Sequence, residues 1–240
     1  MHAVILAGGR GVRLRPYTTT LPKPLVPIGD EYAIIEIVLR QLRDQGFSHI
    51  TIAIGHLGQL IQAYCGNGEQ WNLEIDYWSE ENPLGTMGPI IAHLDEVPEH
   101  FLVMNGDVLT DLNYAELLTG HEASGAPISV ATYDRTVKID FGVLEIGGLD
   151  SDRIVSFVEK PTEHFTVSMG IYALSRETLR PYIAGRPLGF DDLVLDLLAA
   201  ANFPRVTPFD GYWLDIGRPE DYDTANEAWP SLRSTIVPPG

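Results

Sequence analysis

Short apolar runs alternate with stretches of helical periodicity along the first half of this sequence, and the alternation constrains the fold more than any other feature. The apolar, strand-like runs cover residues 2–6, 49–54, 73–78 and 101–104, and the helical stretches cover 33–45, 57–64 and 86–94. Parallel strands joined by helices form right-handed crossovers, and helices then cover both faces of the sheet. The pattern predicts an α/β fold, a Rossmann-like three-layer αβα sandwich around a mixed, mainly parallel central sheet.

The second half of the sequence is less regular. We expect helices at 113–123, 191–201 and 219–227, and strands at 127–133, 142–146, 154–159, 167–174 and 206–209. No linker-like composition divides the chain, so we expect a single domain over 1–229, with a substrate-binding subregion at about 110–190. No hexapeptide repeat indicates a β-helix domain, and the proline and serine content of 230–240 predicts a flexible tail.

Composition excludes several classes of partner. The net charge of −17 argues against nucleic acids and acidic membranes, because the overall field of the protein repels polyanions. No run approaches the roughly 18 apolar residues of a membrane-spanning helix, and the start of the sequence lacks the pattern of an export signal. The single cysteine, Cys65, excludes an internal disulfide and is expected to serve packing. We therefore expect a cytoplasmic protein.

A glycine-rich turn follows the first strand, from Gly8 to Arg13. Glycines there let backbone N–H groups approach a phosphate closely. A dinucleotide fingerprint would need a third glycine, which Leu14 replaces, and the lysine of a Walker A loop is absent. Two alternatives remain: a structural turn with solvated arginines, or a phosphate-binding loop that contains arginines 10, 13 and 15 and is completed by Lys23.

Lys23 is one of only three lysines and stands between two prolines, which hold the loop extended. The string from Leu6 to Pro16, followed by the string 22–27, resembles the signature of the sugar-1-phosphate nucleotidyltransferases, the pyrophosphorylases that make NDP-sugars. The resemblance runs to about Trp229, is greatest to the mannose- and heptose-1-phosphate guanylyltransferases, and implies the nucleotide-diphospho-sugar transferase fold. Val12 departs from the family's usual threonine but leaves the backbone of the turn intact.

The resemblance also implies a site for a nucleoside triphosphate. Residues assigned to it are Leu6, Ala7, Gly8, Gly9, Gly11, Arg13, Lys23, Glu80, Pro83, Gly85, Thr86 and Gly106. Arg13 and Lys23 would bind the triphosphate and act in catalysis. Glu80 would read the base, and a carboxylate there accepts hydrogen bonds from guanine N1–H and from its exocyclic amine, which favours GTP ahead of UTP or dTTP.

Two aspartates far apart in the sequence are the candidate metal ligands. Asp107 should lie at the carboxyl end of a buried strand, where open α/β sheets place ligands, and Asp215 is the second candidate. Each taken singly could equally cap a helix. The resemblance makes both of them catalytic residues and ligands of Mg²⁺, which one or two carboxylates with phosphate oxygens and water can hold.

Three later segments resemble the parts of the family that contact the sugar phosphate. They place Gly142, Glu159, Lys160 and Gly170 at that substrate. Ser168 and Met169 stand where guanylyltransferases often carry Asn-Ala, so the identity of the sugar stays open between mannose-type and heptose-type.

The predicted reaction is an in-line attack of a sugar 1-phosphate on the α-phosphorus of the NTP, with release of pyrophosphate. Alternatives are a glucose-1-phosphate uridylyl- or thymidylyltransferase and a catalytically silent regulatory protein that binds nucleotide sugars. The missing third glycine disfavours a nicotinamide-dependent oxidoreductase. The sequence leaves the oligomeric state open, with a homodimer as one alternative.

Overall fold

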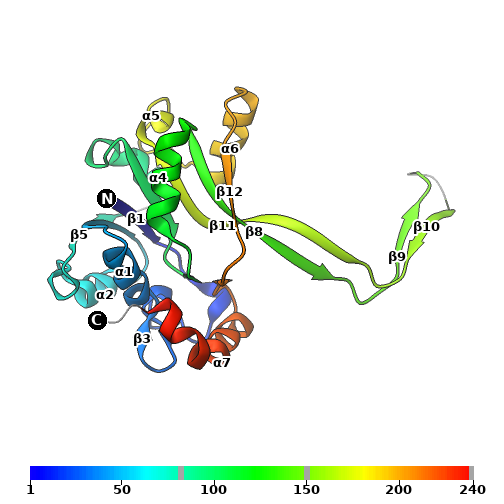
Figure 1. Ribbon diagram of the computed structural model, residues 1–240, viewed down its shortest axis with the longest axis horizontal. Helices are drawn as coiled ribbons and strands as arrows, with labels where there is room; N and C mark the ends of the chain where they lie inside the picture. Colours follow the sequence, from blue (N-terminus) through cyan, green and yellow to red (C-terminus); the bar gives the residue numbers. More distant parts are fainter. Residues whose placement is uncertain (81–83, 149–151, 238–240) are drawn as a thin grey trace.

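The computed structural model describes residues 1–80, 84–148 and 152–237, and its centre is a seven-stranded sheet (Figure 1). The strand order is β12-β8-β11-β6-β1-β4-β5, in which every neighbouring pair is parallel except the two pairs that include β11. The strands of this sheet are β1 (His2–Ala7), β4 (His49–Ile54), β5 (Glu74–Ser79), β6 (His100–Asn105), β8 (Ile128–Lys138), β11 (Thr162–Ser175) and β12 (Arg205–Phe209). The mixed, mainly parallel sheet expected from the sequence is confirmed.

Helices cover both faces of this sheet, as a three-layer sandwich requires. They are α1 (Ile34–Asp44), α2 (Gly58–Cys65), α3 (Gly88–Ala92), α4 (Tyr114–Ser124), α5 (Arg176–Leu179), α6 (Phe190–Ala199) and α7 (Pro219–Ile236). Short 3-10 helices are η1 (Val12–Leu14), η2 (Lys23–Leu25), η3 (Glu69–Trp71) and η4 (Leu94–Glu96). One apolar cluster joins the sheet to α1, α2 and α4, and a second joins the other face to α3, α5 and α6. No helix within the described part of the chain combines the length and apolar character needed to cross a bilayer.

A third apolar cluster packs α7 against the segments that follow β1, including one side of α1. Trp229 and Ile236 on this helix pack with Leu14, Ile28 and Ile37. The expectation of a flexible tail from residue 230 is therefore wrong as far as Ile236, because the helix continues past Pro230 and buries Ile236 at its end. Residues 238–240 lie outside the described residues.

Two strands leave the central sheet and form an arm. β8 and β11 stay paired beyond the body, from Asp134 opposite Thr166 to Lys138 opposite Thr162. A hairpin of β9 (Val143–Ile146) and β10 (Ile154–Val158) lies at the end of this ribbon, far from the body (Figure 1). We call residues 134–148 and 152–166 the arm. The strands expected at 142–146 and 154–159 are present, but they lie outside the central sheet.

His121 on α4 is a buried histidine within the core. Its two ring nitrogens lie 3.1 Å from the hydroxyl oxygen of Ser129 and 3.0 Å from that of Ser175. Burial, with a smaller contribution from nearby His100, lowers the pKa of His121 to about 4. The folded state therefore holds this ring neutral at pH values where the unfolded chain is already protonated.

Acidification is expected to destabilise the protein through this histidine. The unfolded chain binds the extra proton between pH 6.5 and about 4, so the free energy of unfolding falls as the pH drops through that window. We expect His121 to contribute about 2 kcal/mol to the loss between pH 7 and 4.5. Urea unfolding of the wild type and of His121→Gln at both pH values measures this contribution. Equal pH dependence in the two proteins would contradict it.

Candidate functional site

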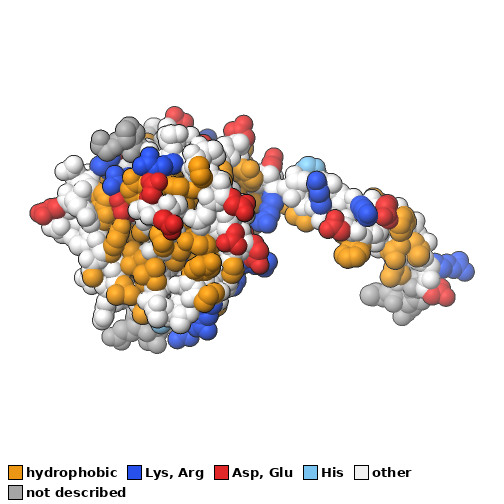
Figure 2. All heavy atoms as spheres, turned by 90° about the horizontal axis from the view of Figure 1, so that it is seen from below, with side chains coloured by type: hydrophobic (Ala, Val, Ile, Leu, Met, Phe, Trp, Pro, Cys, Tyr) orange, Lys and Arg blue, Asp and Glu red, His pale blue; other side chains and the backbone are white. Residues whose placement is uncertain are grey.

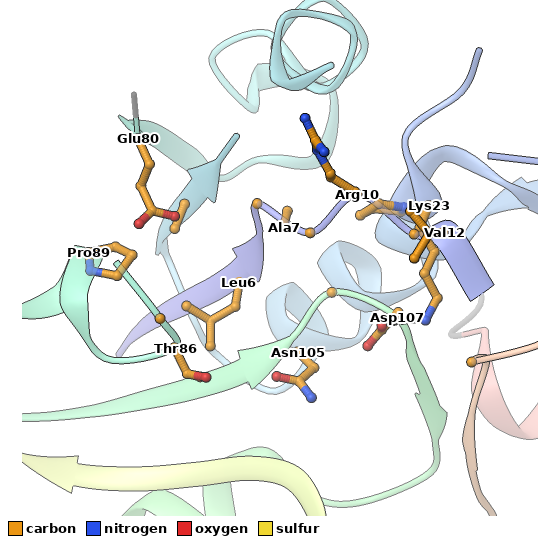
Figure 3. A pocket seen from close by; sticks show the side chains of 18 of the residues that line it. Leu6, Ala7, Arg10, Val12, Lys23, Glu80, Thr86, Pro89, Asn105 and Asp107 are labelled. Atoms are coloured by element: carbon orange, nitrogen blue, oxygen red, sulfur yellow. Dashed lines mark hydrogen bonds and ion pairs between the residues drawn. The ribbon is translucent and has the colours of Figure 1, made fainter. Parts of the chain in front are cut away.

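A cavity of about 470 Å³ lies at the carboxyl ends of β1 and β6 (Figure 3). Its volume is that of a small-molecule site. The residues that line it are Leu6, Ala7, Gly8, Gly9, Arg10, Gly11, Val12, Arg13, Lys23, Pro24, Ala53, Glu80, Gly85, Thr86, Pro89, Asn105, Gly106, Asp107 and Gly217. Of the residues assigned to the NTP from the sequence, all line this cavity except Pro83, which lies outside the described residues.

The glycine-rich turn forms one wall of the cavity. Gly11 has a φ of +61°, a left-handed conformation that glycine adopts without strain, and it begins the short helix η1. A side chain at Gly8 would come within 3.1 Å of the Glu80 carboxylate. Small residues therefore keep the backbone of the turn open to the cavity.

Lys23 and two aspartates form an ionic cluster beside the turn. The Nζ of Lys23 donates to Oδ2 of Asp107 at 2.5 Å and lies 4.0 Å from Oδ1 of Asp215. The short strands β7 (Val108–Thr110) and β13 (Trp213–Asp215) pair antiparallel and bring the aspartates together from distant parts of the chain. Lys23 is buried, held at the start of η2 between two prolines, so its ammonium has a fixed position.

The carboxylates of this cluster fit a divalent cation. Oδ1 of Asp107 is buried and has no hydrogen-bond partner among the described residues. Burial, and then the nearby charge of Asp107, raise the pKa of Asp215. A cation would satisfy the orphaned oxygen and relieve the repulsion. No group of three or more His, Cys, Asp or Glu in the described ranges could hold a metal, so the remaining ligands would have to come from a bound phosphate and water.

Glu80 lies at the opposite end of the cavity from Lys23 and Asp107 (Figure 3). Its Oε1 accepts a hydrogen bond from the backbone N–H of Leu84 at 3.1 Å, which fixes the carboxylate. Burial raises the pKa of Glu80. The cavity therefore has a cationic end at Arg13 and Lys23 and a hydrogen-bond-accepting end at Glu80.

The structure separates the residues assigned to the sugar phosphate. Gly170 lies beside the cavity in a bulge of β11, where a side chain would come within 2.5 Å of the Asn105 amide. Gly142, Glu159 and Lys160 do not line the cavity. They lie together on the arm, because β8 and β11 carry the chain away from the body before these residues occur.

Several lining residues were not assigned to a substrate from the sequence. Arg10 is predicted only as one of the arginines of a phosphate loop, and Asn105 only as the residue before Gly106 in the string after β6. Ala53, Pro89 and Gly217 had no signal of their own, because strand pairing or helix packing brings them to the cavity.

Comparisons with known proteins agree on one family. The model of the family described as "Nucleotidyl transferase" matches residues 2–231. The chain is 34% identical over 232 residues to a mannose-1-phosphate guanyltransferase of Schizosaccharomyces pombe, and 34% identical over 235 residues to a probable mannose-1-phosphate guanylyltransferase 1 of Oryza sativa. Each alignment covers 93% of this chain but only 63% of the relative, so the chain spans under two thirds of the curated relatives.

Solved structures extend the comparison to a protein of similar length. HddC from Yersinia pseudotuberculosis is 27% identical with a TM-score of 0.73, and the alignment covers 95% of this chain and 99% of HddC. A second structure shows HddC complexed with GMP-PN. Its alignment gives 26% identity and a TM-score of 0.71, and it covers 95% of this chain and 99% of HddC.

Proposed function

Because this chain belongs to the nucleotidyl transferase family, we propose that it condenses a nucleoside triphosphate with a sugar 1-phosphate to give an NDP-sugar and pyrophosphate. The observation that carries this proposal is the cavity in which the glycine turn, Arg13, Lys23 and Asp107 meet. A triphosphate needs backbone donors and fixed cations at one point. The cationic end of the cavity supplies both.

The reaction needs no covalent enzyme intermediate, since the nucleophile is already an anion. A phosphate oxygen of the sugar 1-phosphate attacks the α-phosphorus, and the bond from that phosphorus to the pyrophosphate oxygen breaks. The task of the protein is to hold two mutually repelling anions in line and to stabilise the charge that develops on the leaving group. Arg13 and Lys23 would hold the β- and γ-phosphates.

Asp107 and Asp215 would hold a Mg²⁺ ion in this proposal. The orphaned Oδ1 of Asp107 supports a cation between the pair, and so do the burial and the repulsion from Asp107 that raise the pKa of Asp215. When bound, the ion would neutralise phosphate charge and orient the substrate oxygens. Lys23 donates to Oδ2 of Asp107 and so holds this carboxylate in place, while Oδ1 of Asp107 stays free for the ion.

GTP is the triphosphate that we propose. The names of the curated relatives are those of guanylyltransferases, and HddC has been crystallised with GMP-PN. Glu80 lies at the far end of the cavity, fixed by the backbone of Leu84, and its carboxylate would accept from a purine edge. The relatives favour mannose 1-phosphate as the sugar, with a heptose 1-phosphate as the alternative. We place the reaction in the cytoplasm, to which the single, buried Cys65 is suited.

An array of four NTPs against mannose, glucose and heptose 1-phosphates, with coupled detection of pyrophosphate, tests this function. We expect release only when both substrates and Mg²⁺ are present, and fastest with GTP. Nucleotide binding without pyrophosphate release from any pair would favour the silent regulatory protein instead.

Removing the charge of Glu80 tests the assignment of the base. A neutral amide cannot accept from both guanine N1–H and the exocyclic amine, so Glu80→Gln should lower kcat/KM for GTP by about 10- to 100-fold, the cost of hydrogen bonds to a charged group. We expect the rate with UTP or dTTP to change far less. Steady-state kinetics with Glu74→Gln, an exposed acid on β5, gives the matched control. An equal loss for every NTP would contradict base reading by Glu80.

A further inference from the structure

The arm carries an apolar surface that the rest of the chain leaves exposed. Ten of its large apolar side chains are between 39% and 78% exposed: Val137, Phe141, Val143, Leu144, Ile146, Ile154, Val155, Phe157, Val158 and Phe165. Figure 2 shows hydrophobic side chains gathered toward the far end of the arm. Such patches on a folded protein mark surfaces that bind another molecule.

The pattern along β9 and β10 indicates burial on both faces. Consecutive residues of a strand point to opposite faces, and the regularly paired neighbours Val143 and Leu144 on β9, and Phe157 and Val158 on β10, are all apolar and exposed. An isolated two-stranded hairpin is marginal in water. The exposed apolar side chains amount to roughly 900 Å², which is close to the approximately 800 Å² that each partner contributes to a standard protein interface.

The cations that line the cavity all belong to its triphosphate end, that is, to the glycine turn and the loop of Lys23. Among the described residues that line it, Arg10, Arg13 and Lys23 are the cations, and Lys23 already neutralises Asp107. A sugar 1-phosphate would bring a further dianion. The only other lysines of the sequence are Lys138 and Lys160, and both lie on the arm.

A compact group on the arm matches this need. A side chain at Gly142 would come within 3.1 Å of the Glu159 carboxylate, so the two residues lie against each other, and Lys160 follows directly. Lys160 has a φ of +45°, a left-handed conformation that is strained for a lysine and that persists mainly at functional sites. An acceptor for sugar hydroxyls and a cation for the phosphate are therefore held together, away from their own chain's cavity.

We propose that a second copy of this chain receives the arm, and that Glu159 and Lys160 of each copy complete the sugar-phosphate site of the other. A two-fold axis would exchange the two identical arms and bury the apolar hairpins in one closed dimer. The occupant is another copy because the arm holds a cation for the sugar phosphate, whereas the cations that line this cavity belong to its triphosphate end. The assignment of a sugar phosphate to the shared site rests on the proposed function.

Complementation between two inactive variants tests the shared site. Lys23→Ala damages the cavity and Lys160→Ala damages the arm, and each alone should retain less than about 1% of wild-type turnover. The two variants are co-expressed with different affinity tags, and the heterodimer is purified through both tags. Its two sites differ: one carries both lesions and the other carries neither, so we expect about half of the wild-type activity.

A heterodimer with no more activity than the single variants would overturn the proposal, because each site would then be built from one chain. Failure to recover any heterodimer would overturn it as well. The wild-type dimer serves as the activity reference. If the wild type itself releases no pyrophosphate from any substrate pair, the proposed function has failed. The exchange of arms is then tested by the oligomeric state alone.

Sedimentation velocity provides that independent measurement. We expect the wild type to be a dimer at micromolar concentration, and Ile154→Ser/Phe157→Ser to raise the dissociation constant at least 100-fold. Leu195→Ser, which removes an exposed apolar side chain from α6 on the body, is the matched control and should leave the dimer intact. A monomeric wild type, or an arm variant that dimerises normally, would overturn the exchange of arms.

Discussion

Replacing Lys23 with alanine is expected to lower turnover by on the order of 10²-fold or more, the usual cost of one charge partner in the transition state. The ammonium is buried, it lies 2.5 Å from Asp107, and a loop with prolines on both sides fixes it. A fixed cation costs no reorganisation when charge builds on the leaving pyrophosphate. The fall should therefore appear mainly in kcat.

Two further variants separate this effect from a loss of structure. Lys23→Met keeps the apolar stem of the side chain in its packing and should be as inactive as the alanine variant. Arg180→Ala removes an exposed cation that pairs with Glu177 on the surface, and it should turn over normally. Thermal unfolding of the two Lys23 variants and of Arg180→Ala checks that each of them folds. Near-normal kcat in Lys23→Met would remove this lysine from the mechanism.

Asp107→Asn is expected to have an effect of at least similar size, a loss of about 10³-fold or more if the metal is lost with the charge. The neutral amide is a much weaker ligand for Mg²⁺ than the orphaned carboxylate oxygen that it replaces. The same change should abolish binding of Mn²⁺, used as a paramagnetic probe, in the presence of a non-hydrolysable GTP analogue. This readout does not depend on activity.

The control for the aspartate lies four residues along the chain. Asp111→Asn makes the same charge change, and its amide oxygen can still accept from the N–H of Tyr212. We expect it to bind Mn²⁺ and to turn over normally. Unchanged Mn²⁺ binding in Asp107→Asn would contradict the metal assignment.

In metal-free protein Asp215→Asn should not lower the melting temperature, because burial and repulsion already disfavour the charged carboxylate there.

Local signals in the sequence were sufficient for the layered fold. The apolar runs that became β1, β4, β5 and β6 are flanked by helical stripes, so element type and order follow from periodicity. The segment from Pro230 to Ile236 was predicted wrongly because its proline and serine residues indicate a coil when they are read without the packing of the helix. The burial of Trp229 and Ile236 against distant loops keeps that segment helical.

The site was predictable where a short string carries the chemistry. The glycine turn, Lys23 between its prolines, and Asp107 after its strand were all located, and the structure brings them to one cavity. The arm was not predictable, since a strand that leaves a sheet has the same local pattern as one that stays in it. Only exposure in the folded chain distinguishes Phe157 from a core residue.

The pairing of β7 with β13 also determines when the site can form during synthesis. Asp215 follows Asp107 at a long distance in the sequence, and the two meet only when β13 pairs with β7. Contacts between distant residues form late in folding because closing a long loop costs entropy first. A nascent chain can thus assemble β1, β4 and β6 on the ribosome while its carboxylate pair is still incomplete. The proposed nucleotide chemistry would begin only once β13 has emerged and paired with β7.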